Sequence, residues 1–179
     1  KPLSQIPIYL KGIHNDPFVE IIKSVASEHL KDSFDEKFPE YPTFDELVTK
    51  ANISEYFMDT IKKIVTGIPP AKSGRNLLSG LKLLDVNGNI DPTNSAYAKW
   101  FGNQLDAKGP NVVLNRDDIL ETRYGEELDR HFHIEAEMVV IVLASMVYTG
   151  DIELTYPSGK INAGNALDMK EMKYTELLQ

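Results

Sequence analysis

The amino-acid sequence predicts a mainly α-helical chain with a small β component. Three observations lead to this prediction. Apolar residues recur at helical spacing in several separate segments, and prolines and glycines interrupt the chain between them. Residues 152–163 show the alternation of apolar and polar side chains, interrupted by a turn, that is typical of a β-hairpin. A length of 179 residues, 42% of them hydrophobic, allows one domain or two small ones with a buried core.

The first helix is expected to begin at Asp16 and Pro17. An aspartate at the N-cap accepts hydrogen bonds from free backbone amides, and proline suits the first helical position. Apolar residues then recur at helical spacing from Phe18 to Leu30. The helix is expected to end at residues 38–42, where two prolines force the backbone to extend.

Three further helices are expected before the middle of the chain. A short helix covers residues 44–48, and a longer one is capped by Asn52 and closed by Gly67. A loop of small residues follows at 71–74. Leucines between residues 77 and 84 then predict a third helix, which is short.

Residues 85–94 are polar and rich in turn formers, which predicts a boundary between two subdomains. We expect a helical subdomain over residues 1–92 and a second subdomain over residues 93–179. The oxygen-bearing side chains from Asp85 to Asp91 are spaced as at the start of an EF-hand calcium loop, but Ile90 stands where that loop needs glycine. A tight Asn-Gly turn explains the same residues more simply.

The second subdomain is expected to open with a helix capped by Thr93 or Asn94. Residues 112–114 (Val-Val-Leu) are expected to form a short buried strand. Asn115 then caps another helix, in which Asp118 occupies the first turn, where an acid interacts favourably with the exposed amides.

A charged segment, residues 121–130, precedes a strongly apolar helix between residues 135 and 149, which is apolar nearly all round and so is expected to be buried. A hairpin with its turn at residues 157–159 follows. This order of elements is that of a winged helix–turn–helix unit, with residues 112–114 as a third strand. We therefore predict a mainly α (α+β) fold, with a helical N-terminal half and a winged-helix-like unit with a small β-hairpin or three-stranded sheet.

Charge argues against the DNA binding that a winged helix suggests. The whole chain carries a net charge of −8, and residues 111–165 hold four basic and ten acidic residues, a net charge of −6. Phosphate contacts need lysine and arginine, so a protein-contacting or structural role is favoured. The possible interaction surface comprises Lys160, Ser158, Arg123 and Arg130.

The rival prediction is a DNA-binding module. It requires a distant basic cluster, Lys62, Lys63, Lys72 and Arg75, to lie on one face with Lys160 of the hairpin.

Several kinds of chemical site are excluded or disfavoured, because residues that they require are missing from the sequence. Without cysteine there is no disulfide scaffold, thiolate nucleophile or iron–sulfur cluster. Residues 67–73 lack the second glycine of a phosphate-binding loop and follow a predicted helix. One metal set is conceivable, because His131, His133 and Glu135 would share a face of an extended strand. These residues are the basis of a second alternative, a metal-dependent enzyme. We expect no catalytic residue, metal or cofactor in this chain.

Five segments resemble parts of very large bacterial P-loop ATPases, the PglY/BrxC-like proteins of phage-defence (BREX and phage growth limitation) systems. They are residues 113–120 (VLNRDDIL), 137–144 (EMVVIVLA), 147–152 (VYTGDI), 38–42 (FPEYP) and 80–84 (GLKLL). The resemblance covers helix and turn patterns rather than catalytic motifs. It implies an accessory region on the C-terminal side of such an ATPase, so no catalytic residue is carried over.

We therefore expect a non-catalytic accessory or interaction domain of a large cytoplasmic ATPase of phage defence. The chain starts at Lys1 rather than methionine, which indicates a piece of a longer protein. Its expected partners are other domains of that protein and other defence proteins, with DNA disfavoured by charge. No membrane association is expected, because the apolar runs are far shorter than the ~20 residues of a membrane span.

Overall fold

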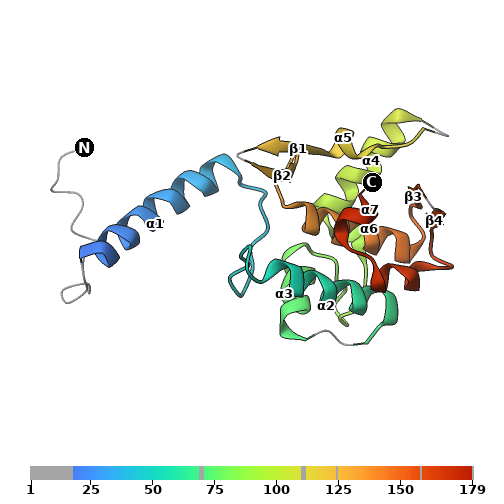
Figure 1. The fold of residues 1–179 in the computed structure, drawn as a ribbon, viewed down its shortest axis with the longest axis horizontal. Coiled ribbons are helices and arrows are strands. Elements are labelled where there is room, and N and C mark those ends of the chain that lie inside the picture. Colours follow the sequence, from blue (N-terminus) through green and yellow to red (C-terminus); the bar gives the residue numbers. More distant parts are fainter. Residues whose placement is uncertain (1–17, 69–70, 110–111, 124, 158, 179) are drawn as a thin grey trace. The chain divides into compact units, whose positions relative to one another are not determined.

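The computed structural model describes residues 18–68, 71–109, 112–123, 125–157 and 159–178 (Figure 1). Backbone contacts divide the chain into two compact units, residues 1–41 and 42–179. The expected boundary after residue 92 falls inside the second unit. Both units together confirm the predicted mainly α fold with a small β component.

The first unit contains one long helix, α1 (Phe18–Lys37). Asp16 and Pro17, the expected start, lie outside the described residues. The helix ends where the prolines predicted, and the Phe38 amide donates a hydrogen bond to the Phe34 carbonyl at 2.8 Å. The Phe34 ring contacts the rings of Phe38 and Tyr41, each with a centroid distance of 5.0 Å, so aromatic contacts fix the turn that follows α1.

The second unit is built around α6 (Ala136–Thr149), which lies at its centre in Figure 1. Every residue from Met138 to Val147 is buried, as the apolar pattern of this segment predicts. The helix ends at Gly150, which adopts the left-handed conformation (φ 86°) that favours glycine. Six elements contact it, namely α2 (Ile53–Thr66), α4 (Ala96–Lys108), the strand β2 (Glu126–Asp129), the 3₁₀ helices η2 (Pro92–Asn94) and η3 (Ala166–Glu171), and α7 (Tyr174–Leu177).

The expected helix over residues 44–48 is absent. The side chain of Asn76 binds the backbone of Glu46 twice, accepting from its amide (3.2 Å) and donating to its carbonyl (2.9 Å). Gly80 allows this segment to approach, because a β-carbon there would lie 2.5 Å from the Phe44 ring. Contacts with a distant helix therefore replace the local helical hydrogen bonds.

That distant helix, α3 (Lys72–Gly80), begins earlier than expected and includes residues 72–74, for which the sequence predicts a loop. Its first turn is capped by Asp59 of α2, whose carboxylate accepts from the Ser73 hydroxyl (3.1 Å) and the Gly74 amide (3.0 Å). A capping group from another helix satisfies amides that the sequence around residue 72 leaves without an acceptor.

Lys82 follows α3 in the left-handed conformation, with φ 55°. The Leu83 amide donates to the Leu78 carbonyl (2.9 Å) and the Lys82 amide to the Ser79 carbonyl (3.0 Å), which is the Schellman ending of a helix. Glycine is usual at this position, because a β-carbon in this conformation costs about 1–2 kcal/mol. Lys82 is thus a strained residue.

Helix α4 is capped by Ser95 rather than by Thr93 or Asn94. The Ser95 hydroxyl is fully buried, donates to the Leu81 carbonyl (2.8 Å) and accepts from the Ala98 amide (3.4 Å). The short helix α5 (Arg116–Ile119) starts after Asn115 as predicted, and the Asp118 carboxylate accepts from the Asn115 amide at 2.8 Å.

The strands form two separate antiparallel hairpins. The pair β3 (Leu154–Tyr156) and β4 (Gly159–Ile161) confirms the predicted hairpin. The pair β1 (Leu120–Arg123) and β2 (Glu126–Asp129) was not predicted and arises within the charged segment 121–130. The predicted third strand is wrong, because residues 112–114 form no strand and pair with neither hairpin.

Of the helices in the described part of the chain, none combines the length and the apolar character needed to cross a membrane.

Ser95→Ala should lower the free energy of unfolding by about 1–2 kcal/mol, because it removes a helix cap and leaves the Leu81 carbonyl buried without its donor. Urea denaturation of the purified chain measures this. The matched control is Asn94→Ala, which removes the exposed side chain that the sequence offered as the cap and should change stability by less than about 0.5 kcal/mol. Equal losses in both variants would contradict the assignment of Ser95.

Candidate functional site

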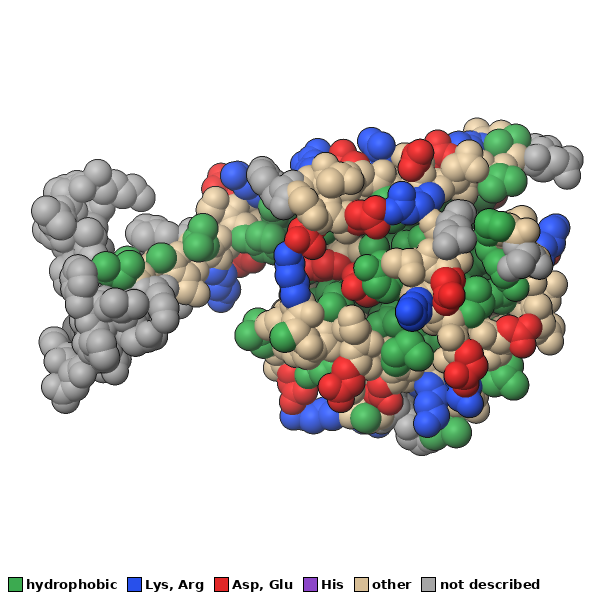
Figure 2. Space-filling view, viewed as in Figure 1, with side chains coloured by type: hydrophobic (Ala, Val, Ile, Leu, Met, Phe, Trp, Pro, Cys, Tyr) green, Lys and Arg blue, Asp and Glu red, His purple; other side chains and the backbone are tan. Residues whose placement is uncertain are grey.

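A groove runs along the second unit between β3, the segment 112–117, α4 and the C-terminal residues. We call it the β3 groove. Its volume is about 650 Å³, and most of its lining is aliphatic or aromatic. Hydrophobic side chains reach the surface over this part of the unit, between charged ones (Figure 2). The apolar lining residues are Phe101, Leu105, Val112, Val113, Leu114, Ile119, Leu143, Ile152, Leu154, Leu177 and Leu178.

The floor of the groove belongs to the core, whereas one wall is open to water. Leu143 of α6 and Ile119 are each only 5% exposed. On the wall, Val112 is 48% exposed and Val113 is 62% exposed. Two adjacent exposed valines beside an apolar floor form a hydrophobic surface of the kind that binds protein segments.

The charges along the β3 groove balance one another. Lys160 of β4 lies 3.4 Å from a carboxylate oxygen of Glu153, and Arg116 lies 3.9 Å from Asp117. Lys160, expected to contact a partner, thus lines the groove as half of an ion pair. The groove therefore presents apolar area with no net charge from these four side chains.

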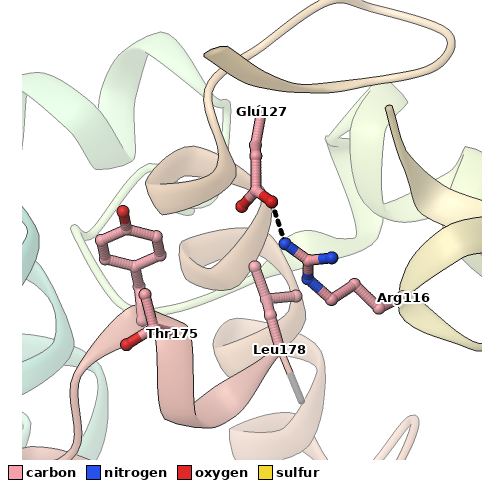
Figure 3. A pocket seen from close by; sticks show the side chains of 5 residues that line it. Arg116, Glu127, Thr175 and Leu178 are labelled. Carbon is pink, nitrogen blue, oxygen red and sulfur yellow. Dashed lines mark hydrogen bonds and ion pairs between the residues drawn. The ribbon is translucent and has the colours of Figure 1, made fainter. Parts of the chain in front are cut away.

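A small pocket of about 280 Å³, lined in part by α7, shares Arg116 and Leu178 with the groove (Figure 3). Arg116 of α5 lines both and forms an ion pair with Glu127 of β2, with Leu178 beside the pair and Thr175 on α7. Both charged side chains remain partly exposed, so the pair adds little to stability and mainly orients α5 against β2.

Carboxylates lie close to this small pocket. Burial raises the pKa of Glu137, in the first turn of α6, and the charges of Glu135, Glu126 and Glu127 raise it further. Burial, followed by the charges of Glu137, Glu127 and Glu126, also raises the pKa of the Tyr174 phenol on α7. Tyr174 and Glu127, which line the same small pocket, therefore lie in a negative environment.

The histidine set is not a metal site in this structure. His131 lies in a turn and stacks flat on Trp100, with ring centroids 5.1 Å apart, and His133 has a positive φ of 59°. Without an extended strand, the expectation that His131, His133 and Glu135 share one face is wrong. Within the described ranges, no group of three acidic or histidine side chains could hold a metal ion.

Asp129 causes this turn. Its carboxylate accepts from the amides of His131 (3.2 Å) and Phe132, and its own amide donates to the Ile134 carbonyl (2.9 Å). Asp129 is fully buried, and this burial raises the pKa of its carboxyl group. The backbone hydrogen bonds close residues 129–134 into a compact loop, which a pattern of alternating side chains could not reveal.

The remaining predicted surface residues do not meet in one place. Arg123 pairs with Glu121 at 2.5 Å, and Arg130 donates to the Asp117 carbonyl at 3.0 Å, both on the side of the β1–β2 hairpin. Ser158 lies outside the described residues. Of the three that the structure describes, Lys160 lines the groove and Arg123 and Arg130 do not.

Two further sequence features have local structural roles. Lys72, in the stretch compared with a phosphate loop, pairs with Glu46, and the hydrogen bond to Glu46 raises the pKa of the lysine. Asp85 accepts from the amides of Asn87 and Asn89, both at 2.8 Å, and forms the predicted tight turn with Gly88 at φ 80°. Hydrogen bonds, that of the Asn89 side chain first, lower the pKa of Asp85.

The sequence does not indicate the groove, because the Val-Val-Leu run at residues 112–114 predicts a buried strand. Their only local signal is the pair of β-branched residues before Asn115, which fits an exposed wall equally well.

Glu137→Gln should raise the free energy of unfolding at pH 7, because ionised Glu137 is half-buried among other carboxylates. Since the folded-state pKa is raised, this cost disappears as the group is protonated. The advantage of the variant should shrink on acidification and vanish below the ordinary value of 4.5. Denaturation curves from pH 4 to 8 measure it, with exposed Glu153→Gln as the control. An advantage that stays constant down to pH 4 would contradict the assignment.

Comparison with known proteins gives one match. Residues 53–179, most of the chain, match the model described as "Family of unknown function (DUF6079) 4th domain", so the chain belongs to this family. Neither the curated proteins nor the solved structures provide a match to the chain.

Proposed function

We propose that this domain is a non-catalytic interaction module of a larger protein and that the β3 groove receives a segment of a protein partner. The observation that carries the proposal is the open apolar groove itself, in which half-exposed Val112 and Val113 stand over a floor of core residues. Burying this area against another protein segment would be favourable, at about 25 cal/mol per Å² of apolar surface.

The family description supports the proposal that this domain is part of a larger protein. A domain counted as the fourth of its family has other domains beside it, which are the nearest candidates for the partner. The resemblance to PglY/BrxC-like ATPases leads us to propose a phage-defence P-loop ATPase as the parent protein, with a cytoplasmic location. In that arrangement nucleotide chemistry belongs to another domain, and this one contacts the ATPase core or a defence partner.

The use of the polar side chains supports a non-catalytic role. Asp129 closes a loop, Asp59 caps α3, and His131 stacks on Trp100. Each of these chemistry-bearing side chains has a structural contact. A catalytic site instead needs an acid, a base and an orienting group around one substrate position.

Protein docking is better supported than the rival DNA-binding role. Helix α6, which stands where a winged helix would read the major groove, is buried from Met138 to Val147. Lys160 of the hairpin is paired with Glu153, and Lys72 with Glu46. The acidic balance of residues 111–165 would repel a phosphate backbone.

Val113→Asp should weaken binding to the remaining domains of the parent protein by about tenfold or more, because it puts a charge on the apolar wall. Binding is measured by calorimetry between the two purified pieces. The matched control is Val86→Asp, at a fully exposed turn position outside the groove, which should bind as the wild type does. Equal binding by Val113→Asp and wild type would overturn the groove as the docking surface.

A further inference from the structure

A second concave surface lies elsewhere on the same unit, formed by the ends of α2 and α3 and the turn at 85–89. We call it the basic concavity. Its volume is about 870 Å³, and it collects three cationic side chains from three segments: Lys63, Arg75 and Lys82. Neutral polar side chains complete its lining, among them Ser79, Asn87, Asn89 and Asn94.

These cations differ from most others of the second unit, and Lys63 is itself largely buried. Across the described ranges, Lys63, Arg75 and Lys82 have no carboxylate oxygen within the 4.0 Å of an ion pair, whereas eight other lysines and arginines of the second unit are paired. The paired cations are Lys50, Lys72, Lys108, Arg116, Arg123, Arg130, Lys160 and Lys170. Three unpaired cations in one concavity produce a local positive potential on a protein with a net charge of −8.

Asp85 is the acid among the described lining residues of the basic concavity, and it is already engaged. Asp85 accepts hydrogen bonds from the amides of Asn87 and Asn89 and from the Asn89 side chain, at 2.8, 2.8 and 3.0 Å. Its carboxylate therefore serves the turn. The carbonyl end of α2 is also occupied, because the Lys63 ammonium donates to the Gly67 carbonyl at 3.1 Å.

Lys82 provides an independent observation. It holds the left-handed position after α3, where glycine or asparagine would be more stable, and its side chain lines the basic concavity. Strained residues of this kind cluster at functional sites, where a side chain is needed at a fixed place.

We propose that the basic concavity binds a phosphate group of a small phosphate-bearing ligand. Lysine and arginine are the side chains that bind phosphate oxygens through charge-assisted hydrogen bonds, and the neutral side chains supply further donors. This site is separate from the β3 groove and does not depend on the proposed docking function.

A small ligand fits better than a nucleic acid. A duplex needs a broad basic face that follows its phosphates, whereas here three cations line one hollow and Lys72, on the same helix as Arg75, is paired with Glu46. In particular, Lys160 lines the β3 groove instead of this surface, and Lys72 binds Glu46.

Calorimetric titration of the complete chain with inorganic pyrophosphate at low ionic strength tests this site. Binding should be measurable, and Lys82→Asn and Arg75→Gln should each weaken it about tenfold, the loss of one charge-assisted hydrogen bond. The control Lys62→Gln removes the same charge one residue from Lys63 and should stay within about twofold of wild type. Lys82→Asn should not lower the Tm, because asparagine tolerates the left-handed conformation, so weakened binding cannot be attributed to unfolding.

Two results would overturn the proposal. One is the absence of pyrophosphate binding, or binding that neither Lys82→Asn nor Arg75→Gln weakens. The other is tighter binding of a short DNA duplex through the same residues, which would make the surface a nucleic-acid contact.

Titration with inorganic phosphate and with a nucleoside diphosphate distinguishes a free anion from a nucleotide as the source of the phosphate. Val113→Asp should bind pyrophosphate as wild type does, so failure at one surface leaves the other intact.

Discussion

Burial of α6 is the constraint on which the second unit depends. A helix that is apolar on every side must be covered on every side, and each large side chain left in water would cost about 1.5–3 kcal/mol. The chain meets this requirement with segments from before and after α6. Helix α2 covers it from the N-terminal part of the chain, and η3 and α7 return from the C-terminal part. Because the cover comes from both directions, a boundary after residue 92 would divide one hydrophobic core.

The two proposed surfaces arise where this cover ends. Around the β3 groove, core residues such as Leu143 form a floor that residues 112–114 and β3 only partly close, so apolar area remains accessible. At the basic concavity, α2 and the neighbouring α3 end, and Lys82 is exposed there while Lys63 is largely buried. The apolar surface suits a protein segment, because contact removes apolar area of both partners from water. The cationic surface suits an anion, because pairing with the cations offsets the loss of the anion's hydration.

Many polar side chains serve the backbone. Asp129, Asp59, Asn76 and Ser95 each satisfy backbone amides or carbonyls at the end or in place of a regular element. A compact chain with short helices has many such free groups, and leaving one buried without a partner costs about 1–3 kcal/mol. For this reason, acids and histidines that look available for chemistry in the sequence have structural roles in the fold.

The sequence by itself determined the elements whose causes lie within a few residues. These include the apolar α6 with Gly150 at its end, the closure of α2 by Gly67, the Asp85 turn and the β3–β4 hairpin. Tertiary structure decided the rest, because the deciding partners are distant. Asp59 caps the first turn of α3 from 14 and 15 residues away. Asn76 binds the backbone of Glu46 from 30 residues away, where the sequence predicts a local helix. Likewise, the exposure of Val113 and the convergence of Lys63 with Lys82 depend on how helices pack around α6, which no local pattern encodes.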